Sequence, residues 1–126
     1  LLGGLATDIG YWITEDPFWA RASLWIIGAG FLGGLAAGVA GTIDFFKVQG
    51  IRRHITSWSH FLTAVVLISL AGTNWWWRID DPSGAVMPWG LYLSAVSAIA
   101  VSVAGILGGT LVYEHSIGIA EAEEEY

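Results

Sequence analysis

Residues 22–43 of this chain carry no charged side chain, and as a helix they are long enough to cross a bilayer. A membrane span needs about 20 apolar residues, and the helix is the form that satisfies its own backbone hydrogen bonds in hydrocarbon. The rest of the chain has the same character. Of its 126 residues, 55% are hydrophobic and 13% are charged, whereas a soluble domain carries roughly 25% charged residues. The sequence therefore predicts an all-α polytopic membrane protein.

Turn residues divide the chain into four expected spans of one domain, residues 1–113, which predicts a four-helix bundle. Asp16 has the side chain of a helix N-cap, and Gly50 interrupts the pattern before the third span. The spans are expected at about residues 1–13, 18–46, 54–77 and 88–113, followed by an acidic cytoplasmic tail at 114–126. Thirteen helical residues cover about 20 Å, against about 30 Å of hydrocarbon. We therefore expect the first helix to be truncated at its N-terminus.

Basic residues cluster in the loop between the second and third spans, at Lys47, Arg52 and Arg53. Because Lys and Arg are enriched in cytoplasmic loops, this loop is expected in the cytoplasm, and six tryptophans then form an aromatic belt at the opposite surface. The chain has only five basic residues and a net charge of −6. It is therefore predicted to lie in a lipid bilayer and to bind no nucleic acid. With no cysteine, it also has no thiol chemistry.

Small residues recur every four positions in the second span, at Gly30, Gly34 and Gly38. This spacing places them on one helix face, and small residues on one face let helices approach closely in lipid. Close helix packing is one interpretation of this face. Space for a flat cofactor or a lipid is the other.

Ionisable residues within spans are costly in a membrane, which makes them candidates for a function. Asp8 lies in the first span, and Arg21, across a short turn, is expected to pair with it. Asp44 is expected to form a structural ion pair with the basic loop, where Arg52 and Arg53 lie. A proton-transfer role for these groups is the alternative.

Three histidines are expected near one membrane level, because His54 and His60 begin the third span and His115 follows the fourth. His54 and His60 lie six residues apart, so their side chains point about 120° apart around the helix. His60 lies about 9 Å deeper and is the better candidate for a buried site. His60 and His115, on different helices, have the arrangement that can hold haem iron. Interfacial histidines that bond to backbone or lipid head groups are the alternative.

The stretch "GGTLVYEHSIGI", residues 108–119, resembles the sequence that closes a bacterial membrane family called domain of unknown function 2231. "AGTIDFF" (40–46) and "DPFWAR" (16–21) also resemble that family, and His60 falls where the family tends to carry a histidine. The matching positions of the closing stretch are Gly108, Gly109, Leu111, Val112, Tyr113, His115 and Gly118, whereas Ser116 replaces a usual glycine.

The resemblance implies a four-span bundle in a bacterial cytoplasmic (inner) membrane. The family usually begins with a His-Pro segment and a His-Phe-Pro segment. Their absence here agrees with the truncation expected from the length of the first span. The family's histidine pattern resembles that of small b-type cytochromes, which implies haem b as a cofactor.

Two functions are therefore expected. The first is an electron-transfer module that holds haem b near the cytoplasmic face, between His60, His115 and the glycine face, and acts with a quinone or a larger redox complex. The second is a cofactor-free subunit that packs against other membrane subunits of a respiratory or photosynthetic complex. A redox carrier or an accessory subunit fits the sequence better than a stand-alone enzyme, because no nucleophile motif accompanies the histidines.

Overall fold

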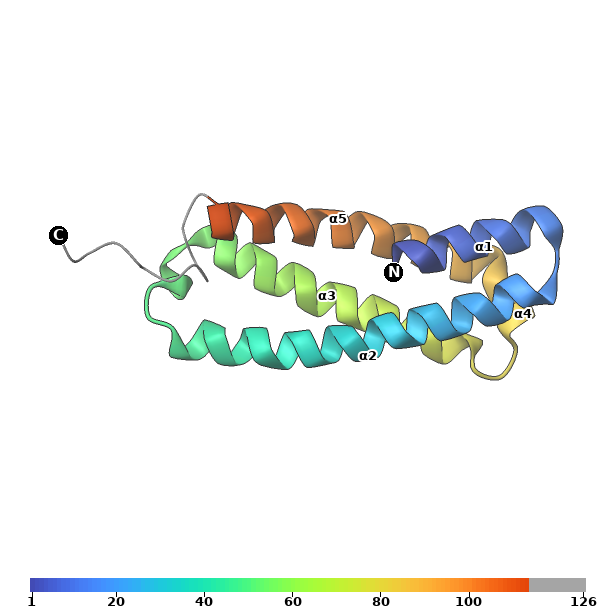
Figure 1. Cartoon of the computed structure of the whole chain (residues 1–126), viewed down its shortest axis with the longest axis horizontal. Coiled ribbons are helices and arrows are strands. Elements are labelled where there is room, and N and C mark those ends of the chain that lie inside the picture. Colours follow the sequence, from blue (N-terminus) through green and yellow to red (C-terminus); the bar gives the residue numbers. More distant parts are fainter. Residues whose placement is uncertain (114–126) are drawn as a thin grey trace.

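The computed structural model describes residues 1–113, and these residues form helices and turns with no strand. The elements run up and down along one long axis (Figure 1). In chain order they are α1 (Leu2–Thr14), α2 (Pro17–Lys47), the short η1 (Ile51–Arg53), α3 (Ile55–Arg78), α4 (Pro82–Ala85), η2 (Val86–Gly90) and α5 (Leu91–Tyr113). The prediction of an all-α membrane bundle is confirmed. The expected acidic tail lies outside the described residues.

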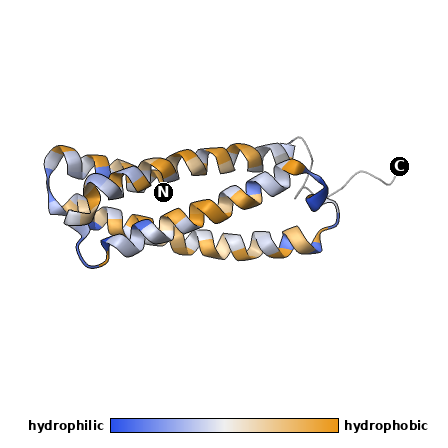
Figure 2. Cartoon of the chain, turned by 180° about the vertical axis from the view of Figure 1, so that it is seen from behind, coloured by the Kyte–Doolittle hydropathy of each residue, from blue (hydrophilic) through white to orange (hydrophobic). Residues whose placement is uncertain are grey.

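Three of the helical segments are long and apolar enough to cross a membrane: Pro17–Lys47, Ile55–Arg78 and Pro82–Thr110. α1 has 13 residues and is shorter. Apolar residues occupy the middle of the bundle along its length, whereas polar residues gather in the loops at both ends (Figure 2). This distribution fits a bundle whose sides face lipid and whose ends face water.

Local sequence signals set the helix boundaries. The Asp16 side chain accepts a hydrogen bond from the Phe18 N–H at 2.9 Å, and Pro17 occupies the first position of α2, where its missing N–H costs nothing. Gly50 has φ of +98°, a conformation that favours glycine, and it ends the loop after α2. The backbone therefore turns where these residues require it.

The helical segment that leads into the fourth expected span is kinked just ahead of that span. The segment begins at Pro82, where Asp81 accepts a hydrogen bond from the Gly84 N–H at 3.0 Å. A π-helical turn at Val86–Gly90 follows, and Met87 within it has non-helical dihedral angles. Regular helix resumes at Leu91, three residues after the expected start at Pro88.

The two ends of the bundle are built differently. At one end, α1 lies against α2 and α5 (Figure 1). We call it the tryptophan end, because it carries Trp12, Trp19, Trp75, Trp76, Trp77 and Trp89. The other end, which we call the basic end, carries Lys47, Arg52 and Arg53. Figure 1 places the N-terminus about midway along the bundle, so α1 covers only the half nearer the tryptophan end. The half nearer the basic end is formed by α2, α3 and α5.

Candidate functional site

A fully buried ion pair joins α1 to α3 inside the tryptophan end. Arg78, the last residue of α3, and Asp8, in the middle of α1, each have an exposed fraction of 0%. The guanidinium binds the carboxylate with both terminal nitrogens, at 2.5 Å to Oδ1 and 2.8 Å to Oδ2. This bidentate geometry is the strong form of an arginine–carboxylate pair.

Three polar side chains complete the hydrogen bonding of this pair. The Ser23 and Ser94 hydroxyls donate to the two Asp8 oxygens, at 2.6 and 2.5 Å, and both also accept from Arg78. The Arg78 Nε–H donates to the Asn74 side-chain oxygen at 2.8 Å. All five N–H donors of the guanidinium therefore have partners. We call Asp8, Ser23, Asn74, Arg78 and Ser94 the ion-pair cluster.

The ion-pair cluster corrects the expected pairing of Asp8 with Arg21. Arg21 is exposed, because it lies two residues before Ser23 and therefore about 200° around the helix from the side that faces Asp8. One sequence signal pointed to the true partner. Asn74 and Arg78 are four residues apart, so they share a face of α3 and present polar groups together.

The ion-pair cluster is suited to holding helices together rather than to binding a ligand. Its charges neutralise each other, and its donors and acceptors are used within it. It joins α1, α2, α3 and α5, since each of these helices contributes at least one member. Neither of the two cavities described below is lined by any of its residues.

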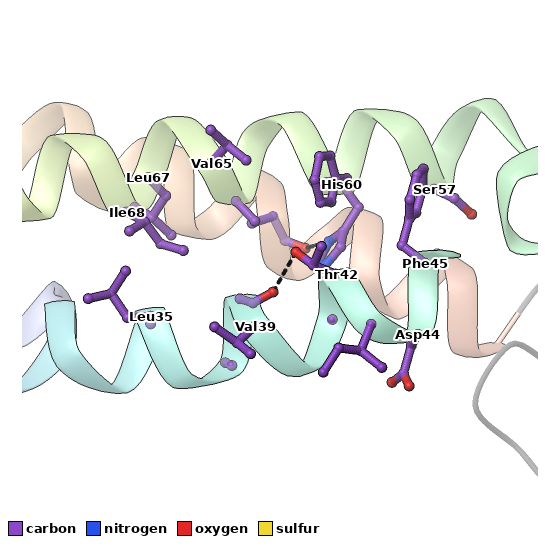
Figure 3. A pocket seen from close by; sticks show the side chains of 18 of the residues that line it. Leu35, Val39, Thr42, Asp44, Phe45, Ser57, His60, Val65, Leu67 and Ile68 are labelled. Atoms are coloured by element: carbon purple, nitrogen blue, oxygen red, sulfur yellow. Dashed lines mark hydrogen bonds between the residues drawn. The ribbon is translucent and has the colours of Figure 1, made fainter. Parts of the chain in front are cut away.

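A groove opens between α2 and α3 in the half nearer the basic end, with a volume of about 830 Å³. Figure 3 shows labelled side chains of both helices along its two sides. Its lining is almost entirely apolar, and on α2 it includes three glycines, Gly34, Gly38 and Gly41. A smaller cavity of about 250 Å³ adjoins it and shares Gly34 with it.

The predicted glycine face packs against two different neighbours. A Cβ atom added at Gly34 or Gly38 would lie 3.5 or 2.9 Å from Ile68 of α3, so this part of the face lets α3 approach. A Cβ added at Gly30 would instead lie 3.4 Å from Leu1. Gly41 has nothing within 4 Å of an added Cβ and faces open space in the groove.

His60 lines the groove and is held against α5. Its Nδ1 atom lies 3.0 Å from the Ala104 carbonyl oxygen, which can only accept, so Nδ1 carries the proton. In the neutral imidazole, Nε2 then keeps its lone pair. Gly108 permits this position, because an added Cβ there would lie 3.2 Å from His60 Cε1. The orientation of the imidazole is therefore set by two residues of α5.

The other two histidines are placed differently from His60. His54 precedes α3 beside Arg53 and does not line the groove. His115, the expected partner of His60, lies outside the described residues. The described residues contain no group of three or more His, Asp or Glu side chains that could hold a metal ion.

Ser57 is a buried polar residue of the groove that sequence reasoning missed. Its exposed fraction is 2%, and within residues 1–113 its hydroxyl has no hydrogen-bond partner. Ser57 lies one turn nearer the basic end than His60 on α3 (Figure 3). The i, i+3 spacing of Ser57 and His60 could have identified it, since such residues lie near each other on a helix.

The charged residues at the mouth of the groove do not form the ion pair expected from the sequence. Asp44 lines the mouth and is exposed, and among residues 1–113 no ion pair links it to Lys47, Arg52 or Arg53. The Arg52 guanidinium lies instead over the Phe46 ring, 5.8 Å from its centre, which is within the range of a cation–π contact.

Comparison with known families shows to which family the chain belongs. The model of the family described as "Predicted membrane protein (DUF2231)" matches residues 1–121. The chain belongs to the DUF2231 family. Comparisons of this DUF2231 chain with the curated proteins and with the solved structures find no match.

The two sites of this DUF2231 protein therefore differ in what they can do chemically. The ion-pair cluster is closed and satisfied. The groove is apolar and carries an imidazole bound through Nδ1 and a hydroxyl without a partner within the described chain. Of the two, only the groove combines space with unused polar atoms, which are the features of a ligand site.

Proposed function

We propose that this DUF2231 protein is an electron-transfer module of the bacterial cytoplasmic membrane that holds haem b in the groove between α2 and α3. His60 would hold the haem iron. The single observation that carries this proposal is the position of the His60 imidazole, which lines an apolar groove and has Nδ1 bound to a backbone carbonyl.

The residues that line the groove fit haem b in three respects. Ligand sites have volumes of about 300–1,000 Å³, and the groove of about 830 Å³ lies within that range. Gly41 leaves part of the α2 side of the groove open, since an added Cβ there would have nothing within 4 Å, and such open space suits a flat ring system. A metal-binding histidine commonly donates its second N–H to a carbonyl or carboxylate, which orients the ring and raises its basicity. The Ala104 carbonyl takes that role for His60.

Haem b bound here would supply one-electron chemistry. The chain would contribute the orientation of His60, a surrounding that excludes water, and a place near the basic end where a quinone or a larger redox complex can exchange electrons. His115 stays the predicted second axial ligand. The positive-inside rule places the basic end in the cytoplasm, and the groove would then open near that face.

The test is a dithionite-reduced minus oxidised absorption spectrum of the protein purified from membranes. The wild type is expected to show the α-band of a b-type cytochrome. His60→Ala should lose it, whereas His54→Ala should keep it, because His54 does not line the groove. A wild-type spectrum without this band, or equal losses in both variants, would refute the proposal.

One set of observations favours a second candidate, a cofactor-free subunit of a larger respiratory or photosynthetic membrane complex. Gly33, Gly105 and Gly109 have nothing within 4 Å of an added Cβ, so these parts of α2 and α5 have no neighbour in the described chain. Small residues on an open helix face suit packing against another membrane helix. A haem-free protein that purifies with a fixed set of membrane subunits would support this candidate.

A further inference from the structure

Ser57 is a residue of the groove wall whose hydrogen-bond donor is unused. The residue lines the groove, and its hydroxyl is buried and has no partner among residues 1–113. Buried polar groups in proteins nearly always have partners, and a hydroxyl in an apolar wall loses the hydrogen bonds that water would give it. An unpaired hydroxyl in the wall of a cavity is therefore a candidate donor to an acceptor atom of a bound molecule.

The other polar groups of the groove do not supply that acceptor. The Thr42 hydroxyl donates to the Gly38 carbonyl at 2.7 Å, and His60 Nδ1 is engaged by the Ala104 carbonyl. Asp44 is exposed at the mouth, where water solvates its carboxylate. Within the described part of the chain, none of these groups therefore supplies an acceptor for Ser57, which leaves that role open to a molecule that fills the groove.

The position of Ser57 indicates which part of that molecule it meets. Ser57 lies about 4.5 Å along α3 from His60, in the direction of the basic end (Figure 3). Among residues 1–113, three exposed cations at this end, Lys47, Arg52 and Arg53, outnumber the exposed Asp44 carboxylate, so the net charge there favours an anion. An oxygen-bearing, anionic edge is therefore expected to point toward the basic end.

We infer that the Ser57 hydroxyl donates a hydrogen bond to a carboxylate of haem b, so that the two carboxylates of the haem face the basic end and its apolar edge lies along the α2 glycines. This inference rests on the proposed function, since it concerns the same groove and the same group. It adds an anchoring residue and a direction of binding that His60 alone does not determine.

The test compares haemin with haemin dimethyl ester, which lacks the two anionic carboxylates. Each is titrated into the purified full chain in detergent micelles, and binding is followed by the Soret band. Wild type is expected to bind haemin at least about tenfold more tightly than the ester, because a hydrogen bond to a charged acceptor is worth at least that factor. In Ser57→Ala this preference should largely disappear.

Ser97→Ala is the matched control. Ser97 is equally buried and its hydroxyl also lacks a partner within residues 1–113, but it lines neither cavity, so this variant should keep the wild-type preference. If circular dichroism shows that Ser57→Ala loses helix, Ser57→Cys replaces it, because the thiol nearly keeps the volume but is a weak donor.

The outcomes separate this inference from the proposed function. A wild type that binds neither compound overturns both. Binding of haemin that requires His60, together with an unchanged ester preference in Ser57→Ala, overturns the role of Ser57 alone. An equal loss of haemin and ester binding in Ser57→Ala also overturns it, because Ser57 would then act on the fold or on the whole ring rather than on the carboxylates.

Discussion

Removing Arg78 is expected to destabilise the bundle more than removing any exposed charge. In Arg78→Ala the Asp8 carboxylate would stay buried, with an exposed fraction of 0%, without its counter-charge. Breaking a buried ion pair from one side costs about 3–5 kcal/mol. Asp8 would keep the Ser23 and Ser94 hydroxyls as donors, which places the expected loss near the lower limit, at about 3 kcal/mol. Total stabilities are about 5–15 kcal/mol, so this loss is large.

The double variant Asp8→Leu/Arg78→Met distinguishes the interaction between the two residues from the effect of losing either residue alone. Replacing both members of a buried pair with apolar groups of similar size is often neutral. The double variant is therefore expected to cost no more than Arg78→Ala alone, although Ser23, Asn74 and Ser94 would lose partners. A coupling of this kind is what a direct contact produces in a double-mutant cycle.

The assay is SDS titration in mixed micelles, with helix content followed by far-UV circular dichroism. Arg21→Ala is the matched control, because Arg21 is exposed near the same end, and it should stay within about 0.5 kcal/mol of wild type. The reasoning is refuted if Arg78→Ala is as stable as wild type, or if Arg21→Ala loses as much stability as Arg78→Ala.

Two further predictions concern packing and orientation. Gly38→Leu should cost about 1–3 kcal/mol in the same titration, because an added Cβ would lie 2.9 Å from Ile68 Cδ1, whereas Gly33→Leu should be near neutral. Equal effects of the two variants would exclude a specific contact at Gly38. Single cysteines at Gln49 and Ser83 should react with a membrane-impermeant reagent from opposite sides of the membrane, with Gln49 on the cytoplasmic side. Labelling of both from one side would contradict the orientation.

The helices of this protein could be predicted because their signals are local. Residues 22–43 form a continuous apolar run, Asp16 and Pro17 define the start of α2, and Gly50 ends the loop that follows. Helical periodicity also separated His60 from His54, since it depends only on the turn of about 100° per residue. These inferences need no knowledge of how the helices are arranged.

The partner of Asp8 could not be predicted in the same way. Arg78 is 70 residues away in sequence, and it meets Asp8 only because α3 returns to the end of the bundle where α1 lies. Arg21 was nearer in sequence but points to the outside. Proximity along the chain is therefore a poor guide when both candidates lie at the same end of a bundle.

The groove and the role of Ser57 depend on tertiary structure as well. The groove is lined by residues of α2 and α3, in the half of the bundle that α1 does not cover (Figure 1). Within the sequence, Ser57 is an ordinary small polar residue near the start of a helix. Only the packing of α2 and α3 shows that its hydroxyl is buried in an apolar wall without a partner inside residues 1–113.

The most direct test of the account is the haem content of a variant in which the groove itself is filled. Gly41→Leu would place a side chain in the groove, and its Cβ would meet no atom within 4 Å. Gly33→Leu, on the same helix but outside the groove, is the control. Haem per protein would be measured as the pyridine haemochromogen after purification from membranes. The account predicts haem in the wild type and Gly33→Leu and its loss in Gly41→Leu, and it is contradicted by a haem-free wild type or by full haem content in Gly41→Leu.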